Sequence, residues 1–464
     1  MTAPTQATGS APDATLVRGL SLLDSVLLMA GGIIGSAIFL AVSDIAEPLG
    51  SPALFIFVWI LGGAITLLAC FAFAELGAMF PNSGGQYVYL REAYGEFYAF
   101  LFGWMVLFIN FSGTVAALAV GFITYLDELL PFGAKEELFR AGPFAPTRGQ
   151  LLALVAIAFM TWVNVVGLRR AATLQNVATW MKFAAIGIFV GFGFALGKGS
   201  TAHFSAPAPP AHPLPLVFAI GLALNGVFWA YDGWNYVACA AGEVKDPQRN
   251  IPRALVLGVV AVGIVYISLN LVYLYAVPLA AIQPARTIAQ TAASALFSSA
   301  LGRWMSLLVA VSCFGAASCC TLAGARVVYA MACDRAFLPK LAYVHPRYHT
   351  PSRALIALGA WSGLLALSGR YDELYTYVMF VGVVAYVATV AGVFVLRRKR
   401  PDAPRPYRCT GYPWVPALYL VIGTVWALIV AYERPKEAVA GAVIMLIAVP
   451  GYLYWKRQKA AIES

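Results

Sequence analysis

The chain has 464 residues, of which 61% are hydrophobic and 11% are charged, and its mean hydropathy is +0.77. Soluble domains carry about 25% charged residues, so this composition excludes a soluble globular protein and indicates a membrane protein with several spans. The formal net charge of +10 would fit a nucleic-acid-binding protein, but the positions of the charges along the chain argue against that class.

Twelve apolar stretches have a length close to the roughly 20 residues that a membrane-spanning helix needs. Residues 1–21, which precede them, are rich in Ala, Pro and Thr and lack the basic start and apolar core of a cleavable signal. We therefore expect a disordered cytoplasmic tail at 1–21. The predicted spans are 22–42, 52–76, 97–126, 149–168, 177–197, 214–242, 254–278, 304–331, 353–369, 374–396, 414–432 and 437–455.

Lysine and arginine are distributed unevenly between the loops. With the amino terminus in the cytoplasm, 21 of the 31 Lys and Arg residues fall in inward loops or at the inward ends of spans, and 9 fall on the outward side. The remaining one, Lys182, lies inside a span. The densest cluster, LRRKRPDAPRPYR at 396–408, belongs to an inward loop. This positive-inside distribution predicts that both termini are cytoplasmic. The basic net charge is then explained by the orientation of the chain in the membrane, which we expect to be the plasma (inner) membrane. No nucleic-acid partner is needed to explain it.

Two spans are interrupted by glycine and polar residues at membrane depth. The first contains GGIIGSAIFL at 31–40, where each glycine weakens a helix by about 1 kcal/mol relative to alanine. The sixth contains AYDGWN at 230–235. If spans 1–5 and 6–10 form two inverted halves, the two breaks occupy equivalent places and meet near the midplane. Such a pair of interrupted spans indicates a transporter binding site, although glycine in a span also serves close helix packing.

The expected chemistry of the breaks fits a zwitterion. A half-helix that begins at Ser36 would direct free N–H groups and its positive dipole end at an anion. A half-helix that ends near Trp229 would offer free carbonyl groups to a cation. One of each across a small gap suits the carboxylate and ammonium groups of an α-amino acid.

Several long motifs resemble those of one transporter superfamily. GGIIGSAIF resembles the first-span signature of the amino acid–polyamine–organocation (APC) superfamily, and AELGAMFPNSGGQYVYLREAYG at 74–95 resembles the loop after its second span. FWAYDGWNYVACAAGEVKDPQRNIPRAL at 228–255 is similar to the sixth span of the L-type amino acid transporters, especially their bacterial members. ARVVYAMACDRAFLP at 325–339 and the basic cluster follow later signatures of the same family. The resemblance covers nearly the whole chain.

The resemblance implies an all-α integral membrane protein with 12 transmembrane helices in a LeuT-like, 5+5 inverted-repeat fold. Helices 1 and 6 would be unwound, and spans 1, 2, 6 and 7 would rock against 3, 4, 8 and 9. The expected segments are repeat 1 at 22–213, repeat 2 at 214–396, a cytoplasmic basic loop at 397–413, and two further helices with a tail at 414–464.

Carried over position by position, the resemblance also implies a substrate site. The carboxylate-binding turn falls on Ser36, Ala37 and Ile38, and the ammonium-binding carbonyls fall on Ile33, Trp229 and Asp232. Trp229 matches the aromatic gate that closes over the substrate, and Tyr231 lies beside it. Ala37 stands where the motif usually has glycine, and its methyl group would favour small substrates.

Two other departures from the family pattern concern the ends of the spans. A usual Arg-Asp-Gly motif after the eighth span reads Cys333-Asp334-Arg335, which puts in doubt the inward-gate contact of that arginine. The animal relatives dock to a glycoprotein through a cysteine between spans three and four, but residues 127–148 contain none. We therefore expect no disulfide-linked heavy subunit.

Lys182 is the most informative single residue for function, because a lysine inside a bilayer costs several kcal/mol unless it has a partner or lies in a cavity. Its long side chain could instead snorkel to the inward surface. The resemblance favours the buried alternative, since sodium-independent members carry a lysine where sodium-coupled relatives hold a cation. The ammonium would bridge the first and eighth spans, and it could also carry a coupled proton.

Asp232 has two interpretations. It could bind a cationic group of the substrate, or it could cap the inner half of span six, where an Asp at a helix N-terminus is stabilising. The second interpretation is the one we favour from the residues. The first would make cationic amino acids more plausible substrates.

The sequence therefore predicts a sodium-independent secondary transporter of L-amino acids, with small neutral substrates, that works as an exchanger. A proton-coupled symporter and a cationic amino acid or polyamine carrier stay as alternatives. An enzyme would need a catalytic cluster at membrane depth, whereas all four histidines lie in loops without metal-ligand spacing. We expect no cofactor, no metal and no catalytic residue.

Overall fold

The computed structural model describes residues 18–140, 145–166, 168–210, 214–285, 287–368 and 371–463. Residues 1–17 of the expected tail lie outside this range. The described chain is almost entirely helical, and its only β-type pairings are two isolated bridges, Leu20 with Val244 and Glu137 with Thr147.

The helices of the amino-terminal half begin with a span that is broken twice. The half comprises α1 (Leu22–Ile33), α2 (Ala37–Leu40), α3 (Val42–Ala46), α4 (Pro52–Met79), α5 (Gln86–Tyr94), α6 (Glu96–Met105), η1 (Val106–Asn110), α7 (Phe111–Leu129), α8 (Arg148–Val166), α9 (Leu168–Leu196) and η2 (Thr201–Ser205). The π-helical η1 joins α6 and α7 into one long span.

The carboxyl-terminal half again begins with a broken span. It comprises α10 (Leu216–Tyr231), α11 (Tyr236–Cys239), η3 (Ala241–Glu243), α12 (Pro247–Ala276), α13 (Leu279–Ile282), α14 (Ile288–Leu296), α15 (Ser299–Cys333), η4 (Pro339–Ala342), α16 (Ser352–Ser368), α17 (Tyr371–Lys399), α18 (Trp414–Glu433) and α19 (Pro435–Glu463).

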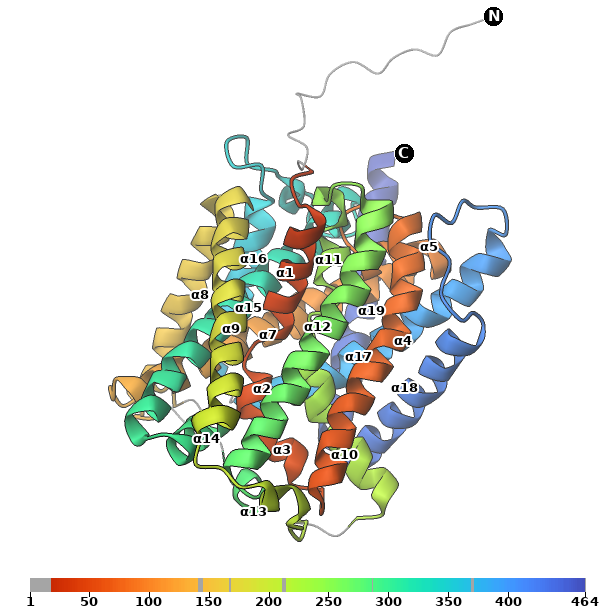
Figure 1. The fold of residues 1–464 in the computed structure, drawn as a ribbon. Helices are drawn as coiled ribbons and strands as arrows, with labels where there is room; N and C mark the ends of the chain where they lie inside the picture. Colours follow the sequence, from red (N-terminus) through yellow and green to blue (C-terminus); the bar gives the residue numbers. More distant parts are fainter. Residues whose placement is uncertain are drawn as a thin grey trace, which may run out of the picture.

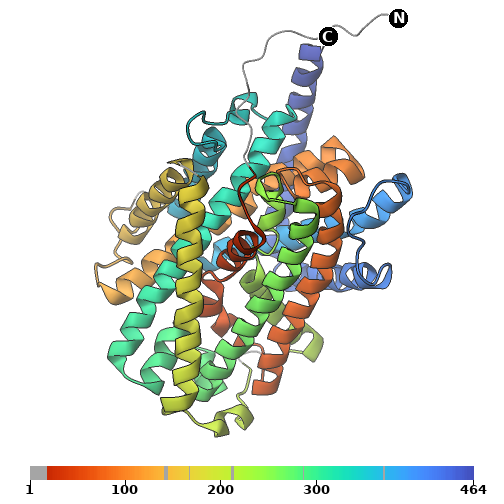
Figure 2. The same ribbon diagram turned by 45° about the horizontal axis from the view of Figure 1, so that its top comes forward.

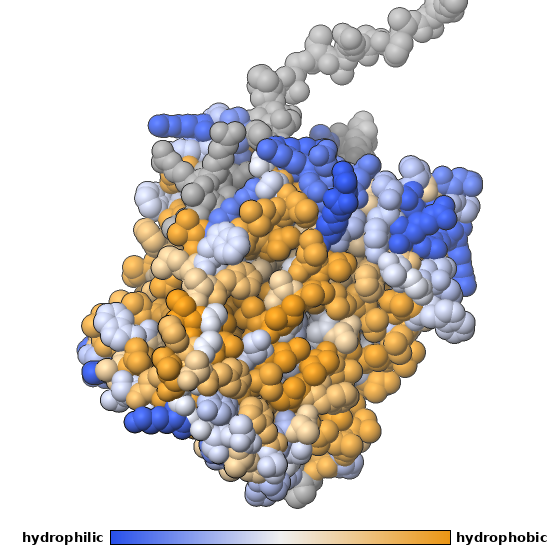
Figure 3. Space-filling model, in the orientation of Figure 1, coloured by the Kyte–Doolittle hydropathy of each residue, from blue (hydrophilic) through white to orange (hydrophobic). Residues whose placement is uncertain are grey.

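Each of the twelve predicted spans overlaps one long helix or a series of consecutive helical segments. Among the described residues, nine helical segments are long and apolar enough to cross a membrane, and Leu216–Tyr231 and Ser352–Leu367 are shorter apolar helices. The surface carries a broad apolar belt with hydrophilic residues at its two ends (Figure 3). Several helices begin earlier than predicted, such as α12 at Pro247, because a helix continues past the apolar region that sequence reasoning detects.

Helix α1 lies in the middle of the bundle, where it packs against α12, α9, α15 and α11 (Figures 1 and 2). Around it, α15 packs along α7, and α12 packs along α4. The start of α1, helix α5 and residues 400–413 lie at one end of the bundle, which we call the terminal face, whereas α13 lies at the opposite end (Figure 1). The central α1 is therefore the element that neighbours from both halves can hold in place.

Candidate functional site

The first break lies where the glycine-rich motif predicts it. Helix α1 ends at Ile33 and α2 begins at Ala37, with Ser36 as its N-cap. The residues between them are fully buried. The first N–H groups of a helix have no partner within the helix. The amides of Ala37 and Ile38 stand at this position, at the start of the second half of the span.

The second break directly touches the first. Helix α10 ends at Tyr231 and α11 begins at Tyr236, so the half-helix ends two residues later than the expected Trp229. Gly233 has a φ of +99°, and a Cβ there would lie 3.1 Å from the backbone carbon of Gly32. Only glycine fits a positive φ and such a close backbone approach without strain. The second unwound segment is therefore packed, backbone against backbone, on the last turn of α1, just before the first break.

Tyr266 joins the two breaks. Its hydroxyl oxygen lies 2.9 Å from the carbonyl oxygen of Ile33 and 2.8 Å from that of Ala230, so its proton can be donated to either one. The side chain comes from the middle of α12 and is fully buried. Sequence reasoning missed this residue, because Tyr266 is one of three tyrosines in this apolar span and nothing local distinguishes it from Tyr273 and Tyr275.

Lys182 projects from α9 into the first break. Its Nζ donates to the carbonyl oxygens of Ile34 at 3.0 Å and Gly31 at 3.2 Å. The hydroxyl of Ser312 in α15 donates to the same Ile34 oxygen at 2.8 Å. The side chain is 1% exposed, so the ammonium lies inside the protein and does not snorkel to the surface. Carbonyls that the break frees from helical bonding are thus held from the fifth and eighth spans.

Asp232 does not cap the following half-helix. The N-cap of α11 is Asn235, whose amide donates to Gln86 at 2.9 Å. The Asp232 carboxylate instead accepts a hydrogen bond of 2.6 Å from the hydroxyl of Tyr386 in α17. The capping interpretation is therefore wrong, and the reason is that the chain turns for three more residues before α11 starts.

A small cavity lies between the two breaks, with about 20 Å³ open to the centre of a water molecule. That space holds about one water. The lining of this cavity includes five of the seven residues predicted to bind substrate. Helix α7 contributes two lining residues that were not predicted, Thr114 and Leu118. The lining residues are Gly32, Ile33, Gly35, Ser36, Ala37, Thr114, Leu118, Trp229, Asp232 and Tyr236.

The other two predicted residues lie elsewhere. Ile38 is fully buried but does not line the cavity. Tyr231 points toward α4, where its hydroxyl donates to the carbonyl of Trp59 at 3.4 Å and its ring packs edge-on against Tyr266. Tyr231 therefore supports the packing of the break from behind.

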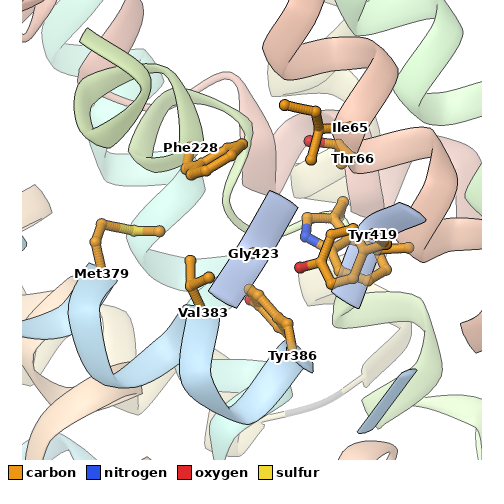
Figure 4. A pocket seen from close by; sticks show the side chains of 10 residues that line it. Ile65, Thr66, Phe228, Met379, Val383, Tyr386, Tyr419 and Gly423 are labelled. Atoms are coloured by element: carbon orange, nitrogen blue, oxygen red, sulfur yellow. The ribbon is translucent and has the colours of Figure 1, made fainter. Parts of the chain in front are cut away.

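A second cavity lies next to the α10 break, which contributes Trp234 to its lining (Figure 4). Tyr386, which bonds Asp232, lines this second cavity, while Asp232 lines the first. The Asp232–Tyr386 hydrogen bond thus lies between the two spaces. The residues that line the second cavity come from α4, α10, α17, α18 and the break itself: Ile65, Thr66, Ala69, Phe228, Trp234, Met379, Val383, Tyr386, Tyr419 and Gly423.

Comparison with known proteins identifies the family of this chain. The sequence profile described as amino acid permease matches residues 20–451. The chain belongs to the amino acid permease family. Its relatives include the serine/threonine exchanger SteT of Bacillus subtilis, with 30% identity over 97% of this chain and 99% of the relative.

Two mammalian relatives match the permease over nearly its whole length. The human Asc-type amino acid transporter 1 is 28% identical over 98% of this chain and 86% of the relative. The mouse large neutral amino acids transporter small subunit 2 is 30% identical over 96% of this chain and 82% of the relative. These similarities assign the permease the 12-span, LeuT-like fold of the APC superfamily.

Ion pairs at the terminal face of the permease link different spans to one another, and one of them involves the broken sixth span. Glu243 in η3 accepts from Arg326 of α15 at 2.6 and 3.1 Å, and both side chains are fully buried. Glu75 of α4 accepts from Arg397 of α17 at 2.6 Å. Asp334, in the motif that departs from the family pattern, pairs with Arg91 of α5. Charge pairs therefore connect neighbouring segments of the chain at the terminal face.

Proposed function

We propose that this permease exchanges small neutral L-amino acids across the membrane by alternating access. The observation that carries the proposal is the backbone contact of the second break with the end of α1, at Gly233 and Gly32, together with a cavity that residues of both breaks line. Unwound backbone inside a bilayer is tolerated only where it is buried or lines a cavity. Backbone amides on one side and carbonyls on the other suit an amino acid's two charged groups.

In this proposal, the substrate carboxylate binds the amides at Ser36, Ala37 and Ile38, at the positive end of the second half-span. The substrate ammonium binds the carbonyls of Ile33, Trp229 and Asp232. In this structure the Ile33 oxygen accepts from the Gly35 amide at 2.7 Å and from the Tyr266 hydroxyl at 2.9 Å, and the Trp229 oxygen accepts from the Asp232 amide at 3.2 Å. A carbonyl oxygen has two lone pairs, so the ammonium would take the place of the Tyr266 hydroxyl at Ile33, and that hydroxyl can donate to Ala230 instead. The Trp229 ring then serves as the gate.

The small volume of the cavity supports an alternating mechanism. An amino acid has at least five heavy atoms, whereas the cavity has room for about one water. Substrate binding therefore requires the helices around the breaks to move apart. We propose that the two inverted repeats, 22–213 and 214–396, supply this movement, with spans 1, 2, 6 and 7 rocking against 3, 4, 8 and 9.

Lys182 supports the sodium-independent part of the proposal. Its amine already fills the space between the carbonyls of Gly31 and Ile34 and donates to both, and in its ammonium form it carries a positive charge there. A second cation there would be repelled, so no sodium ion is needed to hold the break. The same buried amine leaves proton coupling as an alternative, which the assay below distinguishes.

A cationic substrate is a second candidate, because one observation favours it. The Asp232 carboxylate lines the cavity and is only 8% exposed. A buried carboxylate is stabilised by a positive partner, and a cationic side chain could replace the Tyr386 hydroxyl as that partner. The Ala37 methyl group and the serine/threonine specificity in the name of one relative favour small neutral substrates instead.

We also propose the orientation and the partners. The distribution of Lys and Arg supports cytoplasmic termini, so the terminal face would face the cytoplasm. The absence of cysteine from residues 127–148 supports a permease without a disulfide-linked heavy subunit. The site is proposed to move its substrate unchanged, as a carrier and not as an enzyme.

The test is uptake of labelled L-alanine into liposomes that contain the purified permease. Vesicles preloaded with unlabelled alanine or serine should take up label, and empty vesicles should not, whatever the sodium or proton gradient. Uptake into empty vesicles under a proton gradient would favour the symporter. Uptake of arginine in place of alanine, lost in Asp232→Asn, would favour the cationic carrier.

A further inference from the structure

A groove of about 860 Å³ opens on the outside of the bundle near the terminal face. Its walls come from the start of α1, from α4, from the first turns of α12, and from the loop before α18. The groove is separate from the substrate cavity and shares none of its residues. It is lined by Leu22, Phe71, Gln248, Arg249, Pro252, Arg253, Val256, Leu257, Pro406 and Tyr407.

Two arginines give the groove an unbalanced positive charge. Arg249 and Arg253 are four residues apart on α12, so their side chains lie on the same face of the helix. Both are exposed. Within the part of the chain that the structure describes, neither forms an ion pair, whereas Arg91, Arg326, Arg397 and Arg405 at this face are all paired with carboxylates. The described lining of the groove therefore contains two arginines and no carboxylate.

An apolar surface continues from the arginines along the same helix. Leu257 is 52% exposed, Val260 is 42% exposed and Ile264 is 62% exposed. These residues belong to a helix that is long and apolar enough to span a membrane, so their exposed side chains face acyl chains. Phe71 of α4 forms the other wall, and Tyr407 lies at the loop side. Aromatic and basic side chains at this depth are typical of the membrane–water interface.

We propose that this groove binds an anionic glycerophospholipid. The phosphate would lie between Arg249 and Arg253, and the acyl chains would follow α12 past Leu257. Basic pockets between spans bind anionic lipid head groups. Continuity with the acyl-facing surface selects a lipid over free phosphate, because only a lipid covers both the charged and the apolar part. The groove also contacts α1 and α12, which carry the first break and Tyr266, so the bound lipid would stabilise the elements that form the substrate site.

Native mass spectrometry of the full-length permease tests the proposal with dioleoyl phosphatidylglycerol as the probe. Each arginine near the surface contributes about 1 kcal/mol to anionic lipid binding, so Arg249→Gln with Arg253→Gln should weaken binding on the order of 30-fold. Arg249→Lys with Arg253→Lys should retain most of the affinity. The matched control is Arg398→Gln with Arg457→Gln, which removes the same charge from exposed positions outside the groove and should bind like the unaltered protein.

Two further titrations separate the sources of the phosphate. Phosphatidylcholine should bind at least about 10-fold more weakly than phosphatidylglycerol, and inorganic phosphate should not displace phosphatidylglycerol. Equal binding by the groove variant and the control variant would overturn the proposal, as would displacement of the lipid by inorganic phosphate. Because this readout measures lipid and not amino acid uptake, its failure is distinct from a failure of the exchange assay.

Discussion

At the residue scale, the site depends on single side chains that satisfy carbonyl groups freed by the breaks. Lys182 and Ser312 hold the carbonyl of Ile34, and Tyr266 holds those of Ile33 and Ala230. A buried carbonyl without a partner costs about 1–3 kcal/mol. These side chains therefore decide whether the unwound segments keep one conformation.

Lys182→Met tests the contribution of the buried ammonium. Methionine keeps most of the side-chain volume but cannot donate to Gly31 and Ile34. Hydrogen bonds from charged groups contribute about 1.5–3 kcal/mol each, so we expect alanine exchange to fall at least about 10-fold. The measurement is initial-rate exchange in proteoliposomes with equal protein content. Exchange at the unaltered rate would contradict a role of Lys182 in the site.

Tyr266→Phe tests the link between the two breaks. It keeps the ring, which packs edge-on against Trp59 and Tyr231, but removes the hydroxyl. We expect a loss of about 0.5–1.5 kcal/mol of stability and weaker apparent affinity for substrate. The measurements are thermal unfolding in detergent and the substrate concentration at half-maximal exchange.

The same helix supplies the control for this variant. Tyr273 is also fully buried, but its hydroxyl has no hydrogen-bond partner in the described part of the chain. Tyr273→Phe should therefore leave the unfolding temperature unchanged or raise it. If both variants lose stability equally, the two carbonyl bonds of Tyr266 are not the cause.

At the scale of elements, the two broken spans form one unit because glycine allows their backbones to touch. Sequence reasoning located both breaks from glycine and polar residues at membrane depth, since a local cost in helix stability is visible in the local sequence. The exact end of α10, at Tyr231 and not Trp229, depends on the turn that Gly233 and its contact with Gly32 impose.

Gly233→Ala tests this contact. The added Cβ would lie 3.1 Å from the backbone carbon of Gly32. The alanine would also have to adopt a φ of +99°, which L residues rarely do. We expect a cost of about 1–3 kcal/mol and loss of most exchange activity, measured as labelled alanine uptake into preloaded vesicles.

Gly187 and Gly191 in α9 are suitable controls, because a Cβ at either position meets no atom within 4 Å. Alanine there should be neutral or stabilising by up to about 1 kcal/mol. A Gly233→Ala permease as active as these controls would show that the breaks do not need backbone contact.

At the scale of the whole molecule, charge pairs at the terminal face tie together helices that the proposed mechanism must separate. Glu243 follows the broken sixth span, and Arg326 belongs to α15, the eighth span, which is in the set proposed to move relative to the sixth. Removing one partner of a buried pair leaves an uncompensated charge and costs about 3–5 kcal/mol, whereas replacing both partners is often nearly neutral.

Arg326→Met and Glu243→Gln should therefore each lower the unfolding temperature clearly, and the double variant should be closer to the unaltered permease than either one. Thermal unfolding of all four proteins in detergent gives this double-mutant cycle. Additive losses in the double variant would contradict a direct stabilising pair. If the pair also closes the terminal face, the double variant should shift the permease toward an open conformation, seen as faster labelling of a cysteine placed near the site.

The sequence by itself determined the membrane class, the order of the spans and the positions of the two breaks, because hydrophobicity and helix-breaking residues act locally. Only the tertiary structure decided how the breaks are held. The partner of Asp232 is Tyr386, 154 residues away, and the carbonyls at Tyr266 lie 233 and 36 residues from it. Bonds between spans depend on which faces the folded bundle brings together, and a single sequence carries no local signal for that choice.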